Sequence, residues 1–292
     1  MKSMRTKGII LSAVGSILWG SSGIAGQYLL SDAALNAEWL ALFRLFTAGF
    51  ILLLWHAITG GALFALWKNK KDAMSIFWFG AVGMVMTQYM YFVTIKHSNA
   101  ATATVIQYLM PIFIIGWICF IQKRLPKKKE IFCALCAVLG TTFIATHGHF
   151  DSLAISKNAL IFGLLSAVGA AFYTLHPQRI IKKYPSPLVV GWGMIIGGCT
   201  MIPLVCTTPF TGTIDLYTLM AFLYVVIFGT VLSFVLYLAS IRYIEPGETG
   251  IIASLEPLST ILFSFLILGM TFGTFELMGM VLIIAAVIAV TR

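Results

Sequence analysis

One carboxylate, Glu256, lies inside an apolar stretch and directly precedes Pro257. If a helix begins near Glu248, Glu256 lies about 12 Å along its axis, because a helix rises about 1.5 Å per residue. A carboxylate in this position could carry a proton or balance a cationic ligand. Alternatively, the Glu-Pro pair holds a kink, with Glu256 bonded to Arg44 or another donor. We predict Glu256 as a substrate-binding residue and as the candidate for proton coupling, with the structural role as the alternative.

Two side-chain amides, Gln88 and Gln107, also lie in apolar stretches. Gln88 and Tyr91 share a helix face at a spacing of three residues, and Gln107 lies one turn before Pro111, which can kink a helix. A buried amide needs hydrogen-bond partners, which could be a polar substrate or a neighbouring helix. We predict Gln88, Tyr91 and Gln107 as substrate contacts and favour Gln107 over its neighbour Tyr108.

Aromatic side chains accompany these polar groups. Trp19 lies near the middle of the first apolar stretch, and Gly20, Gly23 and Gly26 follow it at near-helical spacing. Small residues let a neighbouring helix or a ligand approach the backbone. Trp19 could therefore line a cavity or pack on these glycines. Tyr173, on a later apolar stretch, is predicted to line the same cavity opposite Trp19.

Three further residues have mixed interpretations. Arg44 lies within an apolar stretch, about 10 Å from its outer end, and could extend to the interface or pair with Glu38 or Asp32. Phe172 is expected to be a cavity wall beside Tyr173. His176 could relay protons, although aromatic belts at membrane interfaces account for many such residues. We favour structural roles for Arg44 and His176.

The sequence lacks the motifs of common enzyme and cofactor sites. It has no P-loop, no HExxH and no GxSxG. Cys133 and Cys136 form a CxxC without a second pair or a βαβ pattern, which does not favour a zinc or redox site. Gly193 and Gly197 form a GxxxG in an apolar stretch, which is typical of helix packing. We therefore expect no catalytic residues, no metal and no cofactor.

The composition indicates an all-α membrane protein. Of 292 residues, 60% are hydrophobic and 10% are charged, with a mean hydropathy of +0.97, whereas soluble domains carry about 25% charged residues. A helix needs about 20 apolar residues to cross a bilayer. We predict about ten such helices, joined by short connections, at approximately residues 8–30, 37–58, 73–95, 99–121, 130–147, 158–177, 187–206, 217–239, 248–269 and 274–291.

The basic residues indicate the orientation. If the N-terminus is cytoplasmic, the cytoplasmic face receives most of the 19 Lys and Arg residues: Lys2, Arg5, Lys7, Lys68, Lys70, Lys71, Lys123, Arg124, Lys127, Lys128, Lys129, Arg179, Lys182, Lys183, Arg242 and Arg292. The other face receives only Lys96 and Lys157, with Arg44 inside a helix. This asymmetry predicts that both termini are cytoplasmic. The net charge of +9 therefore needs no nucleic-acid partner.

A pattern of helix, proline and trailing acid occurs twice. Pro257 and Glu276 each lie 146 residues after Pro111 and Glu130, respectively. The chain therefore divides into two related parts, which we place at residues 1–150 and 151–292.

Each half would contain five helices, an odd number, so the second copy enters the membrane from the opposite side. Inverted repeats of this kind are typical of secondary transporters, which expose a midplane site alternately to either side. The copies differ at two places, where Gln107 matches Ala253 and Met110 matches Glu256. We expect substrate recognition to reside at these unmatched positions.

The chain resembles the EamA-type family of the drug/metabolite transporter superfamily. The residues that carry the resemblance are Leu18-Trp19-Gly20, Arg44, Pro111 with Glu130, and Leu255-Glu256-Pro257 with Glu276. The resemblance implies ten transmembrane helices as two inverted five-helix repeats around a central cavity, and transport of small metabolites, often export of amino acids or amines. Two features depart from the family pattern: Met110 in place of an acid, and the Lys-rich turn from Lys123 to Lys129.

From these observations we predict a secondary active transporter, a permease that exports an amino acid by alternating access. Two alternatives remain. One is uptake of a cationic amine such as choline, because aromatic faces attract quaternary ammonium groups. The other is a non-transporting membrane receptor or assembly protein. The expected partners are a small-molecule substrate, an amino acid or amine, and the lipid bilayer of the cell (inner or plasma) membrane, with no nucleic acid and a monomer as the simplest assembly.

Overall fold

The computed structural model describes residues 2–147, 154–240, 243–244, 252–253 and 255–291, and these residues contain helices and no strand. The first helices are α1 (Lys2–Ser31), α2 (Ala37–Ile58), the short η1 (Ala65–Lys68), α3 (Lys70–Trp78), η2 (Phe79–Met84), α4 (Val85–His97), α5 (Ala100–Gln107) and α6 (Met110–Gln122). The others are α7 (Lys128–Thr146), α8 (Lys157–Leu175), α9 (Gln178–Lys183), α10 (Ser186–Cys206), α11 (Leu216–Val226), η3 (Ile227–Leu232), α12 (Ser233–Ser240), α14 (Leu255–Leu268) and α15 (Thr274–Thr291).

Some of the sequence predictions fall outside the described residues. These are the boundary between residues 150 and 151, the helix start near Glu248, and the positions of Arg242 and Arg292. The described chain contains eight helical segments long and apolar enough to cross a membrane, and two shorter apolar helices, α14 and the first part of α15. The protein is therefore an all-helical, multi-pass membrane protein.

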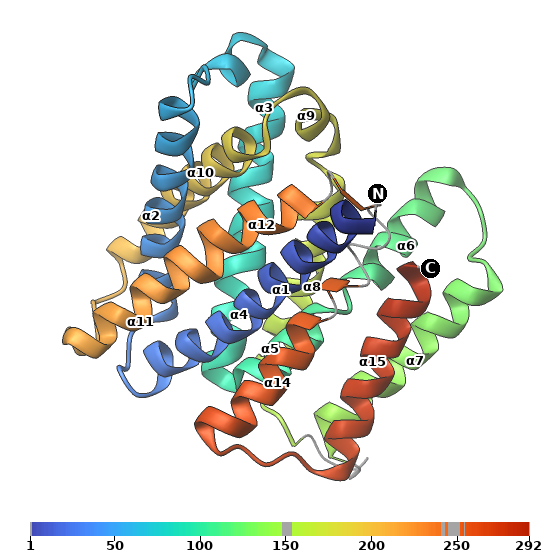
Figure 1. Ribbon diagram of the computed structural model, residues 1–292. Coiled ribbons are helices and arrows are strands. Elements are labelled where there is room, and N and C mark those ends of the chain that lie inside the picture. Colours follow the sequence, from blue (N-terminus) through green and yellow to red (C-terminus); the bar gives the residue numbers. More distant parts are fainter. Residues whose placement is uncertain (1, 148–153, 241–242, 245–251, 254, 292) are drawn as a thin grey trace.

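The helices of the two halves pack on each other in a reciprocal pattern. The first helix of the chain, α1, packs on α12 and α14, while α8 packs on α4, α5 and α6. Two further pairs, α2 with α10 and α7 with α15, lie side by side at opposite sides of the bundle (Figure 1). In each half the first helix therefore packs against the third and fourth membrane-crossing segments of the other half. For α1 these segments are α11–η3–α12 and α14, and for α8 they are α3–η2–α4 and α5–α6.

Several local features recur at the 146-residue offset. Asn69 and Asp215 cap α3 and α11, accepting hydrogen bonds from Asp72 N at 3.3 Å and Thr218 N at 2.7 Å. The Thr218 N–H bond holds the pKa of Asp215 below its usual value. Each of these helices then widens into a π-helical segment, η2 or η3, and these segments lie two residues away from the 146-residue offset. Such segments free backbone carbonyls and are frequent at functional sites.

The repeated acids Glu130 and Glu276 lie in the first turns of α7 and α15. Glu130 accepts from Lys127 N at 2.7 Å, and Glu276 accepts from Gly273 N at 2.9 Å, so each caps its own helix. His147, which follows the end of α7, pairs with Glu276 at 3.0 Å. The two helices therefore run antiparallel, with the two acids at opposite ends of the pair.

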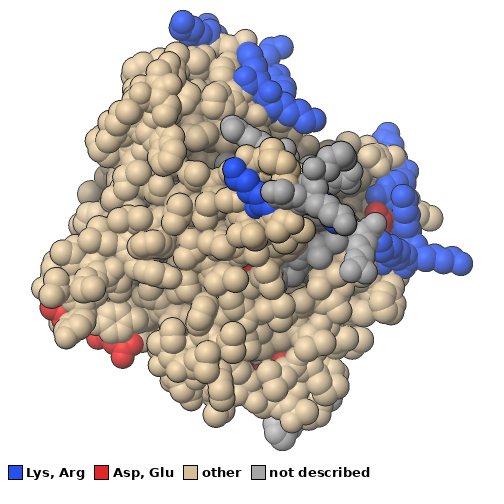
Figure 2. Space-filling model, in the orientation of Figure 1, with Lys and Arg blue, Asp and Glu red and all other residues tan. Residues whose placement is uncertain are grey.

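Glycines allow the closest helix contacts. A Cβ at Gly140 would lie 2.6 Å from the Gly279 carbonyl oxygen, and one at Gly193 would lie 2.5 Å from Phe79. The GxxxG is thus a packing motif, since Gly197 also meets η2 through the Gly80 carbonyl. In Figure 2 the visible Lys and Arg side chains gather on the upper and right-hand parts of the molecule, which we call the basic rim. Acidic side chains lie at the lower left edge, and one lies among the basic side chains at the right.

Candidate functional site

A cavity of about 290 Å³ is lined by helices from both halves of the chain. All six residues predicted from the sequence to bind substrate line it: Trp19, Gln88, Tyr91, Gln107, Tyr173 and Glu256. This volume is at the small end of ligand sites, which are about 300–1,000 Å³. The cavity therefore has the volume of a small ligand site.

Glu256 enters the cavity from the first turn of α14. The Tyr108 hydroxyl lies 2.9 Å from Glu256 Oε2 and 2.8 Å from the Ala253 carbonyl oxygen. Within the described part of the chain, Glu256 Oε1 has no hydrogen bond. The carboxylate of this cavity-lining residue therefore keeps one acceptor without a protein partner. Tyr108, which was predicted below Gln107, orients it.

Tyr108 reaches Glu256 because the predicted helix at 99–121 is divided. Here α5 ends at Gln107 and α6 begins at Met110, with Tyr108 and Leu109 in the turn between them. Pro111 has no N–H to bond the Gln107 carbonyl, so α5 cannot continue regularly into α6. Pro111 predicts the kink in the sequence, but it does not predict the position of Tyr108.

Arg44 is buried at the cavity wall, with 6% of its surface exposed. Its Nε donates to Thr230 Oγ1 at 2.9 Å and its Nη2 to the Gly229 carbonyl at 3.4 Å. The guanidinium also lies over the Phe92 ring, 5.2 Å from its centroid. The prediction that Arg44 extends to the interface or pairs with an outer acid is wrong, because the π-helical η3 presents these inner acceptors instead.

The two charged groups of the cavity act on each other electrostatically without a direct hydrogen bond between them. Arg44 Nη1, like Glu256 Oε1, has no hydrogen bond among the described residues. An unpaired charge in a low-dielectric site is costly. Each group therefore has capacity for a further polar partner inside the cavity.

The two amides behave differently. Gln107 Nε2 donates to the Thr87 carbonyl at 3.1 Å and to Ser166 Oγ at 2.5 Å, which joins α5 to α4 and α8. Gln88 is buried with 8% of its surface exposed, and its amide has no hydrogen bond in the described ranges. Both amides were predicted as substrate contacts, and of the two Gln88 is the one whose amide has no protein partner in the described ranges.

The aromatic wall is a connected group of rings. Trp19 packs on Phe234 and Tyr237, with centroids 5.2 Å and 5.1 Å away, and Tyr173 lies 6.4 Å from Phe234. Trp19 and Tyr173 therefore contact the same ring from different helices. Tyr91 completes the wall, and its hydroxyl shares a 2.8 Å hydrogen bond with Thr104 Oγ1.

Two of the remaining predicted positions lie outside the cavity. Phe172 is not a cavity wall; its ring stacks on His176, with centroids 4.7 Å apart. His176 Nε2 lies 3.1 Å from the Ser75 carbonyl oxygen. These contacts join α8 to α3, which is a packing role.

The cavity reaches one end of the bundle. Ile181 on α9 and Ser186 at the start of α10 line it, so it extends toward the basic rim. At the other end, Gln27 Oε1 accepts from Ala100 N at 2.7 Å, which ties α1 to α5.

Gly20 allows the backbone of α14 to pack closely on α1, because a Cβ at Gly20 would lie 2.6 Å from the Glu256 carbonyl oxygen.

The described residues contain no group of three or more His, Cys, Asp or Glu side chains placed to hold a metal. Cys133 is buried and Cys136 is partly buried, and neither forms a disulfide. The charged and amide groups that line the cavity belong to Arg44, Glu256, Gln88 and Gln107, and hydroxyl groups of Ser, Thr and Tyr side chains accompany them.

Comparison with known families identifies the scaffold. The model of the EamA-like transporter family matches residues 6–146 and matches again at residues 157–292. The chain belongs to the EamA-like transporter family. This confirms the resemblance noted in the sequence and makes the protein a membrane transporter.

This EamA-family protein is similar to several proteins, some of which are named as transporters. It is 37% identical to the uncharacterized inner membrane transporter YicL of Salmonella typhimurium, over 98% of this chain and 95% of that protein. It is 24% identical to the riboflavin transporter ImpX of Fusobacterium nucleatum, over 98% of both chains, and 23% identical to protein PecM of Dickeya dadantii, over 94% and 88%. A solved crystal structure matches with a TM-score of 0.66 at 14% identity, over 97% of this chain and 96% of that chain, which shows the shared fold.

Proposed function

We propose that this EamA-family protein is a secondary active transporter of an amino acid and that it works by alternating access. The observation that carries the proposal is the pair Arg44 and Glu256, which line one cavity and each keep a polar atom without a partner among the described residues. An amino acid is a zwitterion, so its carboxylate and ammonium groups match these two charges. Export is the direction that the family resemblance favours.

In this arrangement each part of the substrate has its own contact. Arg44 Nη1 takes the carboxylate, since guanidinium and carboxylate groups form strong charge-assisted bonds. Glu256 Oε1 takes the ammonium group, and Gln88 adds a neutral hydrogen bond. The rings of Trp19 and Tyr173 surround an apolar side chain. Glu256 is also the residue that we propose for proton coupling, because it is an ionisable group buried within the cavity.

The proposed architecture has ten membrane spans, arranged as inverted repeats at residues 1–150 and 151–292. Its support is the double family match, the reciprocal packing of α1 and α8, and the recurrence of η2 in η3. The basic rim supports cytoplasmic termini. In that orientation the present cavity reaches the cytoplasmic side, and movement of the two halves would open the end now tied by Gln27 and Ala100.

The test is transport by the purified full chain in proteoliposomes. A thermal-stability screen across amino acids, amines, sugars and nucleosides first selects a ligand, because a ligand that binds the folded state raises the unfolding temperature. We then expect the selected amino acid to cross the bilayer under an imposed substrate or proton gradient. If no amino acid moves under any gradient, the proposal is wrong.

The second candidate function is transport of a cationic amine such as choline. It is favoured by the four rings of Trp19, Tyr173, Phe234 and Tyr237 around a cavity that also holds a carboxylate. Competition of choline against the selected amino acid separates the two candidates. Riboflavin, the substrate named for one relative, belongs in the same competition.

A non-transporting receptor of the same fold is distinguished by accessibility. Single cysteines at Ser186, near the present mouth, and at Gln27, near the closed end, report the two sides of the cavity. In a carrier, ligand changes their labelling by a membrane-impermeant thiol reagent in opposite directions. In a static receptor, both sites change alike or not at all.

A further inference from the structure

A second polar site lies on the basic rim, apart from the central cavity. It is a shallow hollow between the start of α3 and α9. The residues that line it are Asn69, Lys71, Asp72, Arg179, Lys182 and Lys183. Four basic side chains thus surround one carboxylate, so the hollow has an excess of positive charge.

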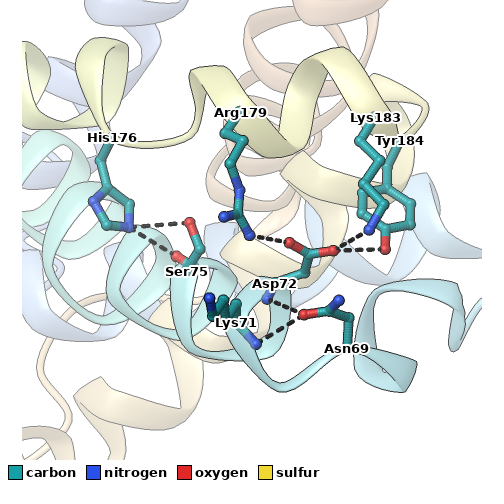
Figure 3. A network of polar contacts seen from close by, with 8 residues as sticks. All are labelled: Asn69, Lys71, Asp72, Ser75, His176, Arg179, Lys183 and Tyr184. Atoms are coloured by element: carbon teal, nitrogen blue, oxygen red, sulfur yellow. Dashed lines mark hydrogen bonds and ion pairs between the residues drawn. The ribbon is translucent and has the colours of Figure 1, made fainter.

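The single carboxylate is already saturated. Asp72 is buried, with 1% of its side chain exposed, and it accepts from Arg179 through Oδ1. Its Oδ2 accepts from Lys183 at 2.5 Å and from Tyr184 at 2.9 Å. Figure 3 shows Arg179 reaching Asp72 from one side, and Lys183 and Tyr184 reaching it from the other. Asp72 therefore fixes the cluster without neutralising it.

The basic side chains remain accessible. The side chains of Arg179 and Lys183 are 63% and 52% exposed although both bond to Asp72. Lys71 and Lys182 are exposed, and neither forms an ion pair or a side-chain hydrogen bond within the described ranges. An anion that enters the hollow would find donors that are already oriented.

The hollow adjoins a surface suited to lipid chains. It lies at the end of the membrane-spanning segment that begins with α3. Along α3, the side chains of Met74, Phe77 and Trp78 are exposed by 58%, 42% and 47%. Exposed apolar side chains below a basic hollow match a phospholipid, whose phosphate lies at the interface and whose chains extend into the bilayer.

We propose that this hollow binds the phosphate group of an anionic phospholipid. The lipid would join α3, in the first family-matched region, to α9, in the second, beside Ile181 at the mouth of the cavity. It would therefore stabilise the arrangement in which the cavity reaches the basic rim. This site is independent of the transported substrate.

The experiment measures the thermal stability of the full chain in neutral detergent at 0.15 M salt, a typical physiological value. Dioleoylphosphatidylglycerol, dioleoylphosphatidylcholine or inorganic phosphate is titrated, and the unfolding midpoint gives an apparent dissociation constant. The test variant is K71Q/K182Q, which leaves the Asp72 bonds intact. The matched control is K128Q/K129Q, which removes the same charge from two exposed lysines at the start of α7 on the same rim.

We expect phosphatidylglycerol to raise the midpoint of the wild-type protein and phosphatidylcholine to leave it unchanged. K71Q/K182Q should bind phosphatidylglycerol about thirtyfold more weakly, since each basic residue near an anionic surface contributes about 1 kcal/mol and 1.4 kcal/mol is a factor of ten. The control should change by less than about threefold. Both variants should unfold at the wild-type temperature without lipid.

Three outcomes would overturn the proposal. Equal weakening of phosphatidylglycerol binding in both variants would show that the lipid responds to the total positive charge of this rim. The orientation of the protein in the membrane explains such a charge without a specific lipid site. An equal response to both lipids would exclude recognition of the anionic headgroup. Stabilisation by inorganic phosphate at the same concentration would assign the hollow to a free phosphate. None of these outcomes depends on which substrate is transported.

Discussion

Replacing Glu256 by glutamine tests the assignment of the ammonium group to this carboxylate. Glutamine keeps the shape and one oxygen acceptor for Tyr108, but it replaces the second oxygen by an amide NH2 donor and removes the charge. The ammonium group of the substrate then loses a hydrogen bond to a charged acceptor, which is worth about 1.5–3 kcal/mol. Amino acid binding should therefore weaken at least about tenfold.

The assay titrates the amino acid selected by the thermal screen and its N-acetyl derivative, which keeps the carboxylate but has no ammonium group. We expect the E256Q variant to lose affinity for the amino acid alone. The N-acetyl derivative should bind as well or better, because Arg44 loses its anionic neighbour. Glu276→Gln is the control, since that acid caps α15 outside the cavity. Equal losses for both ligands, or a change below about twofold, would refute the assignment.

The remaining predictions concern Arg44, Tyr108 and the glycine contact. Arg44→Lys should weaken binding of the amino acid about tenfold but leave binding of its decarboxylated amine unaffected. The reason is that a lysine ammonium group that keeps the Thr230 bond cannot also donate to the substrate carboxylate as Arg44 Nη1 does. Equal losses in the two titrations would contradict this. Tyr108→Phe should lower affinity several-fold without unfolding the protein, since Glu256 loses the donor that orients it; an unchanged titration curve would exclude the orienting role. Gly140→Leu should destabilise the α7–α15 contact by about 1–3 kcal/mol, which a lower unfolding temperature would reveal against Gly116→Leu, where a Cβ meets no atom within 4 Å.

The sequence predicted which residues line the cavity better than it predicted their contacts. Trp19, Gln88, Tyr91, Gln107, Tyr173 and Glu256 all line the cavity. Their selection followed from one physical rule, since a polar or bulky aromatic group in the middle of an apolar helix must have a partner. That rule does not distinguish a ligand from a neighbouring helix, which is why Gln107 was predicted as a substrate contact beside Gln88 although its amide bonds to Thr87 and Ser166.

The roles of Arg44 and Tyr108 depend on backbone irregularities. Arg44 is held by Gly229 and Thr230, whose acceptors become available in the π-helical η3. No simple residue pattern predicts such a widened turn. The break after Gln107 was signalled by Pro111, but the direction in which Tyr108 points is set by the packing of α14, which lies more than a hundred residues later. The apolar stretches of the sequence therefore predict where the helices lie, but they do not predict the irregular turns within those helices.

The symmetry of the scaffold and the asymmetry of the site have different consequences. The helix caps Asn69 and Asp215, the π-helical segments and the acids of α7 and α15 occur in both copies, which fits the proposed exchange of roles between the two halves. Glu256 occurs once, because Met110 occupies the matching position. A ligand held between Arg44 and Glu256 would consequently keep one orientation relative to the protein in both states. In the proposed mechanism the two ends of the cavity can therefore open in turn while the polar contacts to the substrate stay the same. The substrate does not need to rotate within the cavity.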